Sequence, residues 1–334
     1  MRIALTLVAT LALLTANPTS AQTRSLAQDP ALDNLRHPAG AETAAPGTLG
    51  RVRKSGEGKR VMLLIPGIGF GDGVWSEFME RHKADYTMYA VTLPGFDGTA
   101  PLPMPPEGSR YADTPWMTSC TNAIRGLLDD EKVAKVTVVA HWALASQIAL
   151  RLALDAPDRV EAVVLIGGVL KSNYDNPPGM LGWTPDQRAK FAEVMAQKWF
   201  KTVTRRTWDD NNFMSYDYAV NPRRGLYLWR EAQTPPVAVW IRYLLEFYAI
   251  DMATELKNLK VRTLVVRPGF DDPQFYVEKD ADYMRSLCHG SWTGAAELSD
   301  RLHLRTIPQS RLFVMFDQPE ALDLALTEFL GPAM

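Results

Sequence analysis

Short apolar runs recur along the chain, and glycine or proline follows most of them. They are Val61–Ile65, Tyr86–Leu93, Val136–Val139, Val160–Ile166, Val261–Val266 and Leu304–Ile307. Uninterrupted runs rich in β-branched residues are typical of strands buried on both faces. Segments with helical spacing separate them, including residues 115–130, 146–154 and 319–330. Alternating strands and helices predict an α/β fold, with a mostly parallel, doubly wound sheet.

Two regions depart from this alternation. Leu49–Arg60 is charged and rich in glycine, which suggests a hairpin of edge strands. Between Leu170 and about Asp251 the strand pattern stops, and helical patches such as Pro185–Phe200 replace it. This segment contains Trp183, Trp199, Trp208, Trp229 and Trp240. We therefore expect a core built from residues 49–169 and 251–334, with residues 170–250 inserted as a helical lid.

The N-terminus has the pattern of a secretory signal. Arg2 precedes an apolar run over residues 3–14, and the small residues Thr19–Ala21 follow. We expect residues 1–21 to be a signal peptide and residues 22–48 a linker, rich in Ala, Pro and Thr. The apolar run is too short to span a bilayer, so no transmembrane segment is expected in the mature chain. The predicted location is the periplasm or the exterior.

Composition narrows the possible partners. The chain has 334 residues, with 36 Lys and Arg against 38 Asp and Glu, so its net charge of -2 predicts no nucleic-acid partner. Cys120 and Cys288 are the two cysteines, and their spacing leaves open whether they form a disulfide or stay buried thiols. His289 beside Cys288 is an isolated pair, so we predict no metal site and no cofactor. The oligomeric state is left open.

The segment Ala140–Ala145 carries the most informative chemistry. It joins the apolar run at Val136–Val139 to a helical segment, which indicates a strand, a sharp turn and a helix. This setting resembles the G-x-S-x-G nucleophile elbow of α/β-hydrolases. Trp142 stands at the serine position, and Ala140 and Leu144 stand at the glycine positions. The leucine predicts a rearranged turn.

Further motifs in the same order extend the resemblance to roughly residues 49–334. They are Leu63–Gly69, Thr92–Gly98, Ala156–Val160, Val261–Asp271 and Phe313–Glu320. The chain thus resembles the α/β-hydrolase superfamily, whose members carry a Ser-His-Asp triad. The resemblance implies an α/β-hydrolase fold with an inserted helical lid.

Carried over residue by residue, the resemblance leaves the triad incomplete. Asp271 falls at the acid position, with Asp272 as an alternative register, and Leu312 falls at the histidine position. Trp142 and Leu312 cannot transfer the proton that the mechanism requires. The oxyanion hole is made of backbone, so the N–H groups of Ile68 and Ala143 would still supply it.

No other residue is an evident substitute for the missing groups. Ser146 lies inside the predicted helix, and we interpret it as a packing residue. We interpret His141 as part of the scaffold. His303 is expected at the opposite end of the sheet, and His37 and His82 have no polar constellation around them.

Two functions remain open on this basis. The first is a member that has lost serine-hydrolase catalysis. It either binds a small apolar molecule in the pocket walled by Trp142 and Leu312, or serves structurally, with Trp142 filling the former substrate space. The second is an active hydrolase of esters, lactones or amides that uses an unrecognised constellation, a reading that rests on the scaffold alone.

Overall fold

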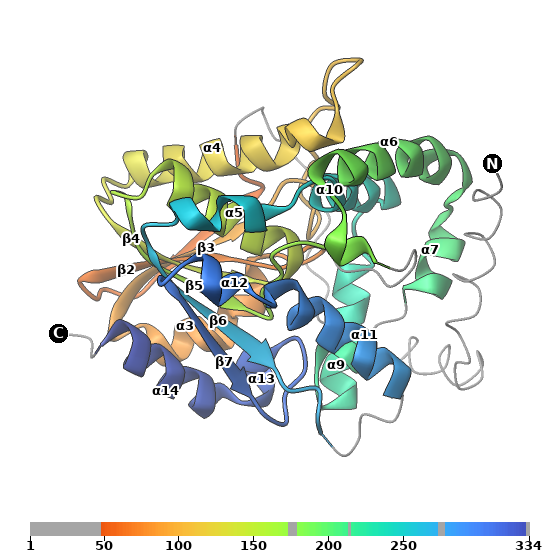
Figure 1. Cartoon of the computed structure of the whole chain (residues 1–334). Helices are drawn as coiled ribbons and strands as arrows, with labels where there is room; N and C mark the ends of the chain where they lie inside the picture. Colours follow the sequence, from red (N-terminus) through yellow and green to blue (C-terminus); the bar gives the residue numbers. More distant parts are fainter. Residues whose placement is uncertain (1–47, 173–178, 213–214, 273–277, 332–334) are drawn as a thin grey trace.

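A seven-stranded sheet forms the centre of the molecule (Figure 1). The computed structural model describes residues 48–172, 179–212, 215–272 and 278–331. The strand order is β1-β3-β2-β4-β5-β6-β7. The strands are β1 (Arg51–Ser55), β2 (Arg60–Ile65), β3 (Tyr86–Thr92), β4 (Val136–His141), β5 (Val160–Ile166), β6 (Arg262–Pro268) and β7 (Leu302–Ile307). Only β1 runs antiparallel to its neighbour, which confirms the predicted mostly parallel α/β class.

Helices cover both faces of this sheet. In Figure 1, α4 (Pro115–Asp130) and α5 (Ala143–Asp155) lie on one side, and α3 (Ser76–His82) and α14 (Pro319–Leu330) lie on the other. Between β6 and β7 the chain forms α11 (Glu278–Cys288) and the short α12 (Ala295–Leu298). The central strands β4 and β5 are almost entirely buried, as their uninterrupted apolar sequence requires.

A helical insert connects β5 to β6. It consists of α6 (Pro185–Thr202), α7 (Arg205–Asn211), α8 (Ser215–Tyr218), α9 (Pro222–Ala232) and α10 (Val237–Ala249). Local sequence fixes where several of these helices begin. Thr184 and Thr204 form capping boxes, and the side chain of Asn221 caps α9. The predicted helical insertion is therefore present.

The insert packs closely on the core. Glu246 of α10 accepts hydrogen bonds from the backbone N–H groups of Trp116 and Met117, at 3.1 and 2.9 Å, and so caps α4. Arg242 pairs with Glu246 at 2.9 Å, and both side chains are buried. Gly69 has a φ of 90°, and a Cβ added there would lie 2.1 Å from the ring of Trp240. Only glycine allows this approach of the insert to the loop after β2.

The hairpin predicted over residues 49–60 is wrong. Arg51–Ser55 pairs with β3, while β2 lies between β3 and β4. The apolar β2 takes a central position with a parallel neighbour on each side, so no edge of β2 remains for β1. Arg51 also bonds Asp72 in the 3-10 turn η1 (Asp72–Trp75), which helps hold β1 on the outer side of β3.

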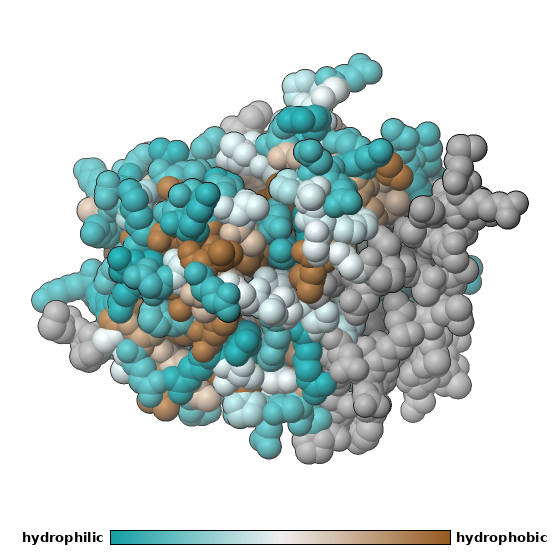
Figure 2. Space-filling view, in the orientation of Figure 1, coloured by the Kyte–Doolittle hydropathy of each residue, from teal (hydrophilic) through white to brown (hydrophobic). Residues whose placement is uncertain are grey.

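The structure tests some of the remaining sequence predictions and leaves others untested. Cys120 in α4 and Cys288 in α11 are both buried and free, so they form no disulfide. The predicted signal peptide, residues 1–21, lies outside the described residues, as does nearly all of the linker over residues 22–48. No described helix is long and apolar enough to span a membrane. On the face shown in Figure 2, apolar patches are interrupted by hydrophilic residues.

Candidate functional site

The candidate site lies where the strand order reverses. From β2 the chain crosses to β3 on one side, and from β4 it proceeds to β5, β6 and β7 on the other. Strands β2 and β4 are neighbours, with Ile65 opposite Ala140. Ile68 follows the carboxyl end of β2, and Trp142 follows that of β4. In open α/β sheets, ligands bind in the crevice at such a switch point.

The turn between β4 and α5 is tight and strained. Trp142 has φ 55° and ψ 149°, and Ala143 has φ 44°. Positive φ values at two successive non-glycine residues cost on the order of 1–3 kcal/mol each, and surrounding structure must hold them. The Trp142 N–H donates to the Ile166 carbonyl at 2.9 Å, which anchors the turn to β5. The strand–turn–helix geometry of an elbow is thus present, with tryptophan at its apex.

A cavity of about 60 Å³ adjoins this turn. Residues of the turn, the insert and α11 line it: Ile68, Trp142, Ala143, Trp208, Asn212, Tyr218, Gln233, Trp240, Leu244, Phe247, Tyr248, Tyr283 and Leu287. No serine, cysteine, histidine, lysine, aspartate or glutamate is among these described lining residues. The lining is therefore aromatic and apolar, with few polar groups.

His141 is part of the scaffold. Its Nε2 lies 3.1 Å from the Leu312 carbonyl and donates to it, and its ring packs 4.2 Å from that of Phe313, centroid to centroid. Complete burial lowers the pKa of His141 to about 3. The imidazole is therefore neutral at physiological pH, a weak base whose Nε2–H is committed to the backbone.

The two candidate acids have different environments. The carboxylate of Asp271 accepts a hydrogen bond from the Gln309 backbone N–H at 2.7 Å, on an exposed loop. Asp272 is buried and binds Arg311 through two hydrogen bonds of 2.9 and 2.8 Å. Arg311 also donates to the carbonyl of Tyr216, at 2.7 Å. The buried carboxylate thus pairs with a guanidinium, which keeps its proton and cannot relay one.

Leu312 lies in the loop between β7 and α13 (Val314–Asp317) and is fully buried. Its N–H donates to the Asp217 carbonyl at 3.0 Å, and the N–H of Phe313 donates to that of Tyr218 at 2.9 Å. This loop therefore pairs with α8 of the insert. A Cβ at Gly167 would lie 3.5 Å from Leu312 Cδ2, which places Leu312 beside the end of β5.

The other candidate groups lie away from the cavity. His289 Nε2 donates to the Pro268 carbonyl at 2.7 Å, and burial lowers its pKa. His303 is exposed on β7 and contacts Phe329. His82 bonds Asp323, and His37 lies outside the described residues. Ser146 Oγ accepts the Val169 N–H at 3.3 Å within the core.

Sequence reasoning missed the part of the lining that comes from the insert. Trp208, Gln233 and Trp240 belong to α7, the α9–α10 connection and α10. The concentration of tryptophans in residues 170–250 was the available signal, but it could not distinguish the residues that face the turn. The pairing of Asp272 with Arg311 was also not foreseen.

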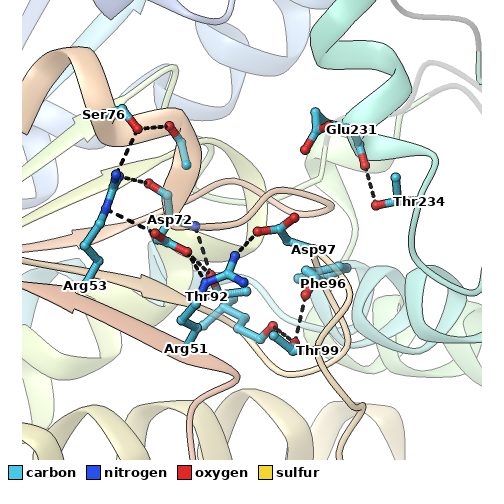
Figure 3. A network of polar contacts seen from close by, with 12 residues as sticks. Arg51, Arg53, Asp72, Ser76, Thr92, Phe96, Asp97, Thr99, Glu231 and Thr234 are labelled. Atoms are coloured by element: carbon cyan, nitrogen blue, oxygen red, sulfur yellow. Dashed lines mark hydrogen bonds and ion pairs between the residues drawn. The ribbon is translucent and has the colours of Figure 1, made fainter. Parts of the chain in front are cut away.

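A polar network supports the loops after β2 and β3 (Figure 3). Arg51 bonds Asp72 at 2.7 Å and also bonds Asp97, and Thr92 Oγ1 donates to Asp72 at 2.8 Å. A cleft of about 500 Å³ lies between these loops and α9. Its lining includes Asp97 but neither Ile68 nor Trp142, so it is separate from the turn.

Comparison with known proteins extends these observations. The model of the alpha/beta hydrolase family matches residues 62–323. Pimeloyl-(acyl-carrier protein) methyl ester esterase of Proteus mirabilis (strain HI4320) is 24% identical over 151 residues, 45% of this chain and 51% of that protein. A 2-hydroxy-6-oxononadienedioate/2-hydroxy-6-oxononatrienedioate hydrolase of Pseudomonas sp is 25% identical over 121 residues, 35% of this chain and 39% of that protein. The chain spans about half or less of the length of these curated relatives.

Solved structures share the fold more fully. An esterase from Exiguobacterium antarcticum gives a TM-score of 0.61 at 15% identity, covering 84% of this chain and 95% of that one. A structure from a study of carboxylesterases of Nitrososphaera gargenis gives 0.60 at 17% identity, covering 86% and 97%. The family match over residues 62–323 is consistent with the order of the strands and with the strained turn after β4. The chain belongs to the alpha/beta hydrolase family.

Proposed function

We propose that this protein has lost serine-hydrolase catalysis and binds a small, mainly apolar molecule at the turn after β4. The observation that carries the proposal is Trp142 itself. Its side chain is 6% exposed and lines the cavity at the position of the family's nucleophile. An indole cannot attack an acyl carbon or pass on a proton under these conditions.

The acid–base half of the site supports the same conclusion. Arg311 holds Asp272, Leu312 fills the histidine position, and the burial of His141 makes it a weak base. General acid–base catalysis needs a group whose pKa lies near the working pH and within reach of the substrate. No such side chain lines the cavity among the described residues.

The cavity favours a small ligand. Aromatic and aliphatic side chains dominate its lining, and the polar groups belong to Asn212, Gln233 and three tyrosines, Tyr218, Tyr248 and Tyr283. Small-molecule sites are commonly apolar with a few fixed polar groups, although most exceed about 300 Å³. A volume of about 60 Å³ therefore restricts the ligand to a few non-hydrogen atoms unless the insert moves as a lid.

Two measurements on the purified chain test the proposal. We expect no labelling by a fluorophosphonate and no turnover of short-chain p-nitrophenyl esters, with an active family member run in parallel. We also expect small apolar probes to raise the unfolding temperature, because a ligand that binds only the folded state stabilises it. Covalent labelling or saturable turnover would instead establish the second reading, an active hydrolase of esters, lactones or amides.

We also propose that the mature chain acts in the periplasm or outside the cell. The support is the sequence of residues 1–21, a charged start with an apolar run and small residues. Mass spectrometry of the protein from the expressing cell tests this directly. An N-terminus at Gln22 is expected, and a cytoplasmic protein that retains Met1 would contradict it.

A further inference from the structure

Three polar atoms of the cavity's lining residues are sealed from solvent without a hydrogen-bond partner. They are Nε1 of Trp142, Nε1 of Trp208 and Oε1 of Gln233. The side chains of Trp142 and Trp208 are both more than nine-tenths buried. A buried polar group without a hydrogen-bond partner is destabilising, so a ligand that supplies a partner to these atoms gains affinity.

Several other indoles are paired, although Nε1 of Trp75, which lies outside the cavity, is also buried without a partner. The Nε1–H groups of Trp116, Trp240 and Trp292 donate to backbone carbonyls at 3.0, 2.7 and 2.8 Å. Buried indoles usually find such a partner. Trp142 stands on the turn and Trp208 on the insert, so the two residues with unpaired donors line one cavity from different elements.

Two backbone donors add to the indoles. The N–H groups of Ile68 and Ala143 belong to the same lining, and neither has an assigned acceptor in the described part of the chain. Ala143 is the first residue of α5, whose N-terminus favours negative charge. The amide of Gln233 can turn to present its NH₂ group as well. The lining residues therefore offer several N–H donors, and the hydroxyl groups of the three lining tyrosines can donate as well.

This donor set matches a carboxylate better than a neutral carbonyl. A carboxylate has two oxygens with about four acceptor sites, whereas a carbonyl has two. No acidic side chain lines the cavity among the described residues, so none repels an anion. Since a water molecule needs about 10–15 Å³ of cavity space, a volume of about 60 Å³ holds roughly four to six waters. The carboxylate must therefore carry only a short aliphatic chain.

We infer that the ligand is a short aliphatic carboxylate, held by the indole N–H groups of Trp142 and Trp208 and the backbone N–H groups of Ile68 and Ala143. This rests on the proposed function, since it places a ligand where a substrate would react. Because the indole nitrogens are sealed, a small displacement of the insert accompanies binding. The apolar tail lies against the aromatic lining.

The experiment follows indole N–H resonances of the full chain labelled with ¹⁵N-tryptophan. Propionate is titrated, and propionamide, which has nearly the same shape without the charge, is the matched control. We expect propionate to shift two indole resonances saturably and propionamide to shift them at least about tenfold more weakly. The resonances of Trp116 and Trp292 should stay in place, because their donors are already paired. Equal response to the two probes, or shifts elsewhere only, would overturn the inference.

Single substitutions show which tryptophan gives each resonance and how much each indole N–H contributes to propionate binding. Trp142→Phe and Trp208→Phe each remove one donor and should weaken propionate binding about tenfold or more. Trp183→Phe, which removes an indole outside the cavity, should leave the affinity unchanged. If either cavity variant does not fold, the comparison of propionate with propionamide on the unmodified chain still decides the question.

Failure of this inference can be separated from failure of the proposed function. If neutral apolar probes shift the same two resonances and propionate does not, the cavity binds ligands but not carboxylates. If neither kind of probe shifts them, the cavity takes up only water. Fluorophosphonate labelling would refute the loss of catalysis whatever these titrations give.

Discussion

The two halves of the site, the turn after β4 and the loop that carries Leu312, are built differently in this chain. On the turn side, the strained backbone at Trp142 and the N–H groups of Ile68 and Ala143 adjoin a cavity. On the acid–base side, Asp272 and Arg311 form a buried ion pair, and the loop at Leu312 pairs with α8. Under the proposed function the turn side binds a ligand, whereas the ion pair and the loop at Leu312 attach the insert to the core.

The difference follows from what each half is made of. Backbone donors are held by β2, β4 and α5, so they survive replacement of a side chain. A proton relay consists of side chains, and one replacement abolishes it. The buried carboxylate then needs another partner, because an unpaired charge in the interior is costly. Arg311 is that partner, and it also binds carbonyls of the insert.

The largest expected effect comes from breaking the buried ion pair of Arg311 with Asp272. Arg311→Met leaves Asp272 buried without its cation and should lower the free energy of unfolding by about 3–5 kcal/mol, measured by urea denaturation. Arg110→Met is the matched control, because the pair of Arg110 with Asp113 is exposed, and it should change the urea midpoint little. Similar urea midpoints for the two variants would show that the buried ion pair does not stabilise the fold.

A second test concerns how closely the insert approaches the turn side. Gly69→Ala places a methyl group against the ring of Trp240 at a positive φ, and should cost about 2–4 kcal/mol of unfolding free energy. Gly98→Ala has a similar φ of 73° with no atom within 4 Å, so it should cost about 1–2 kcal/mol. Comparing the unfolding free energies of the two variants separates the cost of steric overlap with Trp240 from the cost of a positive φ. Equal losses would contradict the close packing.

The pH dependence of stability tests His141, which connects the two halves. Its folded pKa of about 3 lies below the unfolded value of about 6.5, so its contribution is complete above pH 6.5 and is lost as the pH falls. Between pH 6.5 and 5 we expect the contribution of His141 to the unfolding free energy to fall by about 2 kcal/mol.

The neutral variant His141→Gln should remove this dependence. Burial raises the pKa of Asp317 to about 6, so its contribution has the opposite sign and falls as the pH rises from about 4 to 6. The difference between wild type and His141→Gln therefore isolates the histidine, in urea titrations at pH 7 and 5. Parallel curves for the two proteins would mean that His141 takes up a proton as readily in the folded state as in the unfolded chain.

The smallest expected effect comes from restoring the nucleophile alone. Trp142→Ser should give no ester hydrolysis, because no described histidine lines the cavity. Adding Leu144→Gly and Leu312→His supplies a base, but Arg311 still holds the buried carboxylate. We expect p-nitrophenyl ester turnover from these three changes to stay far below that of an intact triad. Robust turnover by Trp142→Ser alone would reveal a base that the structure does not bring to the turn.

Local sequence was enough to predict most of the core. The apolar runs at β2, β4 and β5 report burial on both faces, and such runs fold as strands wherever a parallel sheet surrounds them. The motif order placed Trp142 on a turn between strand and helix, where the structure has it. The helical patch predicted over Pro185–Phe200 likewise corresponds to α6, which spans Pro185–Thr202.

Only the tertiary structure decided the contents of the site. The pairing of β1 with β3, the choice of Asp272 over Asp271 for burial, and the approach of Trp208 to Trp142 join segments that are distant in sequence. Hydrophobic periodicity in the sequence indicates which residues are buried but not which of them are in contact. Hydrophobic burial is non-directional, so the partners of a buried group are fixed only when the whole chain has packed.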